Sequence, residues 1–218
     1  DQQVALHQAA IADRRIVTKA DIAELDEVAR LTLRLKSLNA GAEIRIVSHG
    51  AIAADELFGA ALVDPQTGRA DLDRWLNLDG HRAADDHHDH ADDDHPDHHH
   101  PHIRFSGGPA HGDAIGTWLI EEENPVDWER LSPLLGAIVS HYGDRLLRLK
   151  GAIFTADDPR PLVMHGVQRL FHPPVRLDRW PGPARTSIVA IGAPGAERAA
   201  ALIAAALSES VARPLAAE

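Results

Sequence analysis

Residues 15–47 read RIVTKADIAELDEVARLTLRLKSLNAGAEIRIV, and this stretch decides the fold of the first part of the chain. Residues 15–18 and 43–47 are rich in isoleucine and valine, which predicts two short strands. A strand, a helix and a second strand, followed by a short helix predicted at 53–61, favour a parallel α/β sheet. The intervening helix is predicted because apolar side chains recur every three or four residues; they are Ile22, Leu25, Val28, Leu31, Leu35 and Leu38.

Two polar loops follow the two predicted strands. The first is Thr18-Lys19-Ala20-Asp21 and the second is Ser48-His49-Gly50. Ligands of parallel α/β sheets bind outside the carboxyl ends of the strands, where both loops lie. The Asp21 carboxylate could accept hydrogen bonds from the guanine N1–H and exocyclic amine, with the Lys19 stem along the base plane. The short pattern also allows a solvated loop in which Asp21 caps the following helix.

A stretch rich in histidine and aspartate interrupts the chain at residues 81–102. It reads HRAADDHHDHADDDHPDHHHPH and holds nine of the fifteen histidines and seven aspartates. Imidazole and carboxylate groups are common ligands of divalent metals, and the stretch has no apolar periodicity, so it predicts a disordered, metal-binding linker. The candidate ligands are His81, His87, His88, His90, His95, His98, His99, His100 and His102.

The metal itself is not determined by these ligands. Many interchangeable ligands favour several exchanging ions over one rigid site, and Zn, Co or Ni would each fit. Two other interpretations are an acidic linker with incidental histidines and a purification tag. The internal position and the interspersed aspartates disfavour a tag, and nine histidines in this stretch fit an incidental linker poorly.

Composition limits the partners of this protein. The net charge is −11, and residues 79–102 contribute −7 through eight aspartates and one arginine, which leaves −4 for the remainder. Nucleic acid and anionic membrane surfaces are therefore poor partners. The chain has no cysteine, which excludes disulfides and thiolate sites within it and agrees with a cytoplasmic protein. The sequence contains no run of eighteen apolar residues, so no membrane span is predicted.

The rest of the chain predicts a small α+β domain with a mainly antiparallel sheet, because its strands follow one another at short spacing. Strands are predicted at 115–121, 145–155, 162–171 and 187–191, and helices at 127–141, capped by Asp127, and at 196–208. We therefore divide the chain into an α/β part at 1–78, a linker at 79–101, a second domain at 102–212 and a frayed tail at 213–218.

Several stretches, taken together, resemble the CobW-type GTPases, a family of P-loop metallochaperones. In chain order they are ADRRIVTKAD at 12–21, LNA at 38–40, SHG at 48–50, the His-rich segment, DRLLRLKG at 144–151, GVQRL at 166–170 and SIVAIG at 187–192. No single stretch is specific, but together they cover nearly the whole chain in the family's order.

The resemblance implies a GTP-binding domain joined by the His-rich linker to the family's C-terminal domain. Thr18, Lys19 and Asp21 would read the guanine, with Thr18 where other GTPases have asparagine, and Ser48 and His49 would form the last guanine-contact loop. It further implies a cytoplasmic GTP-dependent metallochaperone that binds GTP with Mg and delivers Zn or Co to a client metalloprotein. The resemblance leaves open whether the protein forms a homo-oligomer.

Three features of the family do not occur in these 218 residues: the phosphate-binding loop, the acidic Mg-binding strand end and the Cys-x-Cys-Cys motif. The resemblance places all three upstream of Asp1. We therefore expect the intact protein to be a GTPase and this chain alone to be inactive, because nothing in it would stabilise phosphoryl transfer. A nucleotide-independent metal buffer remains the alternative function.

Some isolated polar residues in the second part remain ambiguous. Three residues stand out in the resemblance: Lys150, Gly151 and Gln168. A structural role is favoured for them, and glycine within a strand, such as Gly151, usually marks a bulge or close packing. Isolated histidines are mostly surface or hydrogen-bonded residues, although they could extend a path for metal; they are His111, His141, His165 and His172.

Overall fold

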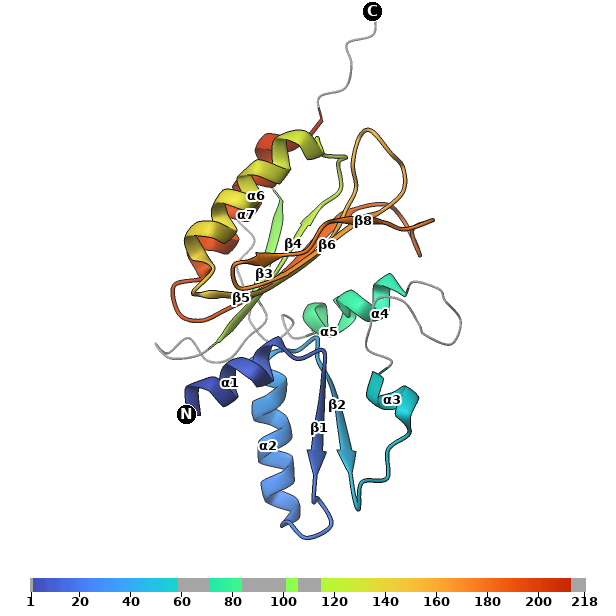
Figure 1. Ribbon diagram of the computed structural model, residues 1–218, viewed down its shortest axis with the longest axis vertical. Coiled ribbons are helices and arrows are strands. Elements are labelled where there is room, and N and C mark those ends of the chain that lie inside the picture. The colour runs from blue at the N-terminus through green and yellow to red at the C-terminus, as the bar shows by residue number, and fades with distance from the viewer. Residues whose placement is uncertain (1, 59–70, 84–100, 106–114, 213–218) are drawn as a thin grey trace, which may run out of the picture.

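The strands pair into two separate sheets (Figure 1). The computed structural model describes residues 2–58, 71–83, 101–105 and 115–212. β1 (Arg14–Thr18) and β2 (Glu43–Val47) form a two-stranded parallel sheet. The other described strands form one antiparallel sheet in the order β3-β4-β9-β5-β6-β7, with β8 on β6. The predicted fold class, a parallel α/β part followed by an α+β domain with an antiparallel sheet, is confirmed.

Helix α2 (Leu25–Leu38) connects β1 to β2 as predicted, with α1 (Gln2–Ile11) before β1 and α3 (Ala54–Phe58) after β2. The apolar stripe begins at Ile22, but α2 begins only after a turn in which the Ile22 N–H donates to the Lys19 carbonyl at 3.2 Å. No side chain of α2 is buried, and Leu25 is 83% exposed. The main contacts of α2 among the described elements are with α1 and β2, which leaves part of its stripe exposed, at Ile22, Leu25 and Leu31.

The antiparallel sheet forms the core of the second part of the chain. Its central strands are buried on both faces, because helices cover each side. The strands are β3 (His102–Phe105), β4 (Gly116–Glu122), β5 (Leu146–Ile153), β6 (Leu162–Val167), β7 (Leu170–Phe171), β8 (Val175–Arg176) and β9 (Thr186–Gly192).

Helices α6 (Trp128–Tyr142) and α7 (Glu197–Ser210) lie side by side on one face of this sheet (Figure 1). Asp127 caps α6, as predicted, by accepting hydrogen bonds from the backbone N–H groups of Glu129 at 3.0 Å and Arg130 at 3.3 Å. The small alanines of α7 allow its backbone to approach α6 and the sheet. The core between these layers includes Leu131, Leu135, Ile203, Leu207, Ile120, Ile153 and Ile188.

Two short helices, α4 (Leu72–Leu76) and α5 (Leu78–Ala83), cover the opposite face together with α1. Leu72, Trp75 and Leu76 are buried in one cluster with side chains of β4, β5, β6 and β9. This differs from the predicted linker that starts at 79, since residues 79–83 are helical and pack with the sheet. Both faces of β5 carry buried apolar side chains, so a second covering layer is needed. Among the described helices, none is long and apolar enough to cross a membrane.

The strand predicted at 162–171 is a hairpin formed by β6 and β7. Gln168 turns the chain with a φ of 52°, a left-handed conformation for which its sequence has no signal. Gly151 serves close packing, because a Cβ there would lie 2.9 Å from Met164 Cε and 3.2 Å from Ile188 Cγ1. The register shift of β5 lies instead near its start, before Arg148.

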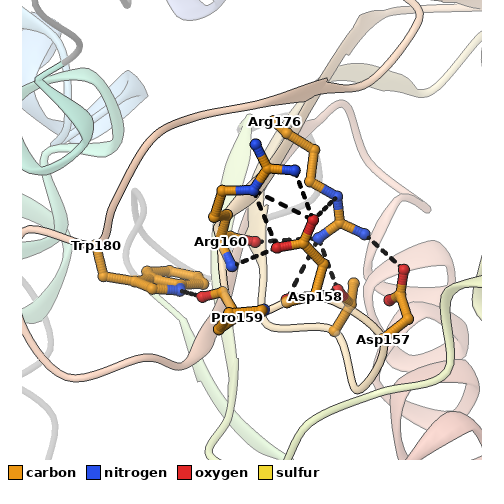
Figure 2. Close-up of polar contacts among 7 residues, drawn as sticks. Asp157, Asp158, Pro159, Arg160, Arg176 and Trp180 are labelled. Atoms are coloured by element: carbon orange, nitrogen blue, oxygen red, sulfur yellow. Dashed lines mark hydrogen bonds and ion pairs between the residues drawn. The ribbon is translucent and has the colours of Figure 1, made fainter.

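An ion-pair network braces the loop after β5 (Figure 2). Asp158 pairs with Arg160 at 2.8 Å and with Arg176 of β8 at 3.6 Å. The hydrogen bonds from Arg160 lower the pKa of Asp158 to about 2. The Trp180 indole N–H donates to the Pro159 carbonyl at 2.9 Å. Trp180 and the residues after it then form one wall of a cavity of about 410 Å³, with α4 and α5 opposite.

Candidate nucleotide and metal sites

The loop after β1 turns sharply away from the strand. Thr18 is the last residue of β1 and is exposed, and Lys19 has a φ of 61°. Such a left-handed conformation is uncommon outside glycine and holds the following residues in a tight turn. The chain then reaches Asp21 before α2 begins. Glu24, not Asp21, stands at the N-cap of α2, and it makes no side-chain cap hydrogen bond. The Asp21 carboxylate is thus not used as a helix cap.

The loop after β2 lies beside it. His49 has a φ of 53° and Gly50 a φ of 70°, and the Ala51 N–H closes the turn on the Ser48 carbonyl at 3.0 Å. The His49 Nε2 atom lies 3.5 Å from the Asp21 Oδ2 atom, with the His49 side chain 81% exposed and that of Asp21 25% exposed. The structure therefore brings the two predicted guanine-contact loops together at the carboxyl ends of parallel strands, as the topology requires.

Of the nine predicted metal ligands, the structure describes His81 and His102. His81 lies in α5, is 2% exposed and has its ring against Gly41. Burial, and secondarily the charge of Lys150, lowers the pKa of His81 to about 4. The predicted position of His81 in an open linker is therefore wrong, because α5 packs on the sheet and carries this side chain inward.

His102 is the first residue of β3 and stands opposite Glu121 of β4 in register. No group of three or more histidine, aspartate or glutamate side chains in the described ranges is placed to hold a metal ion. The other predicted ligands lie outside the described residues; they are His87, His88, His90, His95, His98, His99 and His100.

A charged junction joins the first part of the chain to the antiparallel sheet. Asp13, directly before β1, pairs with Arg148 of β5 at 2.6 Å and also with Lys150. The Lys150 ammonium donates to the Trp75 carbonyl at 2.9 Å and lies 4.8 Å from the centroid of the Trp75 ring. Burial, then Arg148, lowers the pKa of Lys150 to about 8, although Asp13 opposes this shift. Lys150 therefore has the structural role that the sequence favoured.

The role of Asp13 was missed by sequence reasoning, although the residue stands in a stretch that carries the family resemblance. Its partners follow it by 135 and 137 residues, and no local pattern indicates such a pair. The neighbouring Asn39 is also buried, and its side chain donates to the Ala10 carbonyl at 2.8 Å. These contacts fix α1, the end of α2 and the start of β1 together.

The second part of the chain matches a known domain family. Residues 115–209, from just before β4 through nearly all of α7, match the family described as the cobalamin synthesis protein cobW C-terminal domain. In this region the chain is therefore similar to the CobW-type proteins. A curated relative, the zinc chaperone YjiA of Escherichia coli K12, is 27% identical over 168 residues, which are 77% of this chain and 43% of that protein.

Two solved structures support the same fold. The Zn(II)-bound YjiA GTPase from E. coli matches with a TM-score of 0.57, and a Zn(II)-bound triple mutant of YjiA GTPase matches with a TM-score of 0.58. Each is 24% identical and covers 93% of this chain and 54% of its own. The chain thus spans about half the length of the relatives it matches.

Proposed function

We propose that the intact protein is a GTP-dependent metallochaperone that delivers Zn or Co, with Ni as a further candidate, to a client metalloprotein. The observation that carries this proposal is the meeting of Asp21 and His49 at the carboxyl ends of β1 and β2, in a chain with a CobW C-terminal domain. The YjiA relative is a zinc chaperone by name, which supports zinc as the first metal to test.

In this proposal the guanine base binds between the two loops. Asp21 accepts hydrogen bonds from N1–H and the exocyclic amine, while the Lys19 stem lies along the base and Thr18 faces the same space. Ser48 and His49 close the site from β2, and binding of the base displaces His49 from Asp21. Both loops are held by left-handed backbone at Lys19 and His49, so the site is partly preorganised.

The CobW C-terminal domain and the His-rich segment supply the metal side of this function. The segment between α5 and β3 concentrates metal ions through its many imidazoles, and the C-terminal domain contacts the client protein. In the intact protein, Mg and the γ-phosphate would be bound by the part that corresponds to the family's phosphate loop. The proposed location is the cytoplasm.

The junction at Asp13 offers a physical link between nucleotide and metal. Asp13 directly precedes β1 and the guanine-reading loop directly follows it, so a shift of this strand on GTP binding also acts on Arg148 and Lys150. If nucleotide changes the affinity for metal, metal must change the affinity for nucleotide by the same factor.

The test is nucleotide competition in the intact protein. Asp21→Asn replaces an acceptor with an amide N–H, which would oppose the guanine amine and match the carbonyl of xanthine. We expect the variant to lose GTP affinity by at least about tenfold and to gain XTP binding. Asp26→Asn, on the exposed first turn of α2, is the matched control. Unchanged competition between GTP and XTP in Asp21→Asn would remove Asp21 from the site.

The composition of residues 81–102 favours one alternative, a metal buffer that works without nucleotide. The two functions differ in a single measurement, the zinc affinity of the intact protein with and without GTP. A buffer binds zinc equally in both states, whereas a GTP-dependent chaperone changes its affinity.

A further inference from the structure

Two of the isolated histidines meet on the β6–β7 hairpin. Gly166 and Phe171 are paired in register, and the next residues outward are His165 and His172. The His172 backbone N–H donates to the His165 carbonyl at 3.1 Å. Their imidazole rings are stacked, with centroids 4.3 Å apart and an interplanar angle of 29°. The sequence places these rings seven residues apart, and only the hairpin brings them into contact.

The hairpin that carries the pair is firmly held. The Gln168 N–H in its turn donates to the Leu147 carbonyl at 3.1 Å. Arg169 donates to the Ser140 carbonyl at 3.1 Å and pairs with Asp144 at 2.6 Å, which anchors the turn to the end of α6. Because the backbone is fixed before any ligand arrives, binding there requires little further ordering.

We propose that His165 and His172 form an open binding site for a divalent transition metal, in which each imidazole supplies one nitrogen ligand. Opposed residues of neighbouring strands have Cβ atoms about 5 Å apart, a spacing from which two imidazoles can reach one ion. Zn–N bonds are about 2.1 Å long, so small rotations of the stacked rings suffice to place both nitrogens around zinc. Water or a donor from another protein completes the coordination.

The surroundings of His165 favour its neutral form, which is the form that binds metal. His165 stands opposite Lys150 in register, and Arg148 and Asp13 lie in the same charged junction. Burial, then His172, Arg148 and Lys150, lowers the pKa of His165, and Asp13 opposes this effect. Asp13 offsets one of the two neighbouring cations, so a bound divalent ion meets a moderate repulsion.

These features suit transfer of metal better than storage. Two protein ligands, an open coordination sphere and nearby positive charge all limit affinity, unlike the closed four-ligand sites that hold structural zinc. The Trp75 ring lies edge-on to His165 with centroids 6.2 Å apart, and Lys150 stacks on the same indole. The pair is therefore next to the junction between the two parts of the chain. Its role as a relay for cargo metal rests on the proposed function, whereas its metal binding does not.

The test is histidine footprinting of the complete chain with diethyl pyrocarbonate, resolved by peptide mass spectrometry, over a series of buffered free zinc concentrations. Zinc buffering prevents the His-rich segment from depleting the metal. We expect zinc to protect His165 and His172 together at one midpoint. In His172→Asn, the zinc concentration needed to protect His165 should rise by about tenfold or more, because the second ligand no longer acts intramolecularly. His141→Asn, which removes an exposed histidine on α6, should leave that midpoint unchanged.

The outcomes separate this inference from the proposed function. Protection of the His-rich peptides without protection of His165 and His172 overturns the proposed site and leaves the chaperone proposal standing. Protection of His165 that is unaffected in His172→Asn also overturns it, since the two rings would then not share an ion. Joint protection in the unaltered chain, together with its loss in His172→Asn, supports the site without depending on GTP.

Discussion

Removal of the Asp13 carboxylate tests the junction most directly. Asp13→Asn leaves Arg148 and Lys150 without their counter-charge, and both side chains are largely buried, at 15% and 10% exposed. Lys150 already has a pKa of about 8 in the fold instead of 10.5, so its charged form costs about 3.5 kcal/mol relative to water. Without Asp13 this pKa falls further, until Lys150 loses its proton.

Deprotonation limits the cost. At pH 7 a neutral Lys150 costs about 5 kcal/mol relative to the free, protonated side chain. This is about 1.5 kcal/mol more than its charged form already costs in the fold, so Lys150 adds no more than about 1.5 kcal/mol to the loss of stability. Arg148 cannot deprotonate, and loss of its charged hydrogen bond costs about 1.5–3 kcal/mol. Since the Asp13 side chain is 31% exposed, we take the lower end of this range, about 1.5 kcal/mol, for Arg148. Together with the share of Lys150, we expect Asp13→Asn to lower the free energy of unfolding by about 3 kcal/mol.

The assay is urea unfolding, followed by tryptophan fluorescence and far-ultraviolet circular dichroism. The destabilisation should increase from pH 8 to pH 6, by up to about 1.4 kcal/mol per unit, because keeping Lys150 neutral becomes harder as pH falls. Asp144→Asn, which breaks an exposed pair with Arg169, is the matched control and should change stability far less. A loss below about 1 kcal/mol, or one that does not change with pH, would refute the electrostatic account.

Further predictions concern His81 and two glycines. Because the pKa of His81 is about 4 in the fold and 6.5 when unfolded, the unfolded chain binds the extra proton between these values. The stabilisation is complete above pH 6.5 and falls by about 2 kcal/mol from pH 7 to pH 5, and urea titrations should show a smaller fall in His81→Gln. Gly136→Ala, in an open position of α6, should raise stability by about 0.5–1 kcal/mol in the same assay. Gly192→Ala should lower it by about 1–3 kcal/mol, because the new Cβ would overlap Ala196 and lie 2.9 Å from the Arg145 carbonyl. Equal urea midpoints for the two variants would contradict at least one of these two expectations.

The elements that the sequence predicted well are those with local causes. The crossover from β1 through α2 to β2 follows from apolar spacing within about thirty residues, and Asp127 caps α6 through contacts two and three residues away. The two guanine-type loops were placed together by topology alone, since parallel strands end at the same edge. Their contact at Asp21 and His49 agrees with that expectation.

The misjudged elements depend on distant partners. Residues 79–83 were assigned to a linker because His81 and its polar neighbours show no strong pattern, yet α5 packs on strands that follow it in the chain. The β6–β7 hairpin was read as one strand because Gln168 is not a residue that usually marks a left-handed turn. The apolar stripe of α2 was predicted correctly, but how much of it is exposed depends on which other elements surround the helix.

The sequence by itself determined the crossover from β1 through α2 to β2, the polar loops after these strands and the composition that points to metal, because each arises from residues close together in the chain. Tertiary structure decided the ion pairs of Asp13, the burial of His81 and the stacking of His165 on His172. These features arise where strands and helices distant in sequence pack together. A carboxylate, a neutral imidazole or a metal ligand gains its chemistry from such neighbours, and sequence spacing does not specify them.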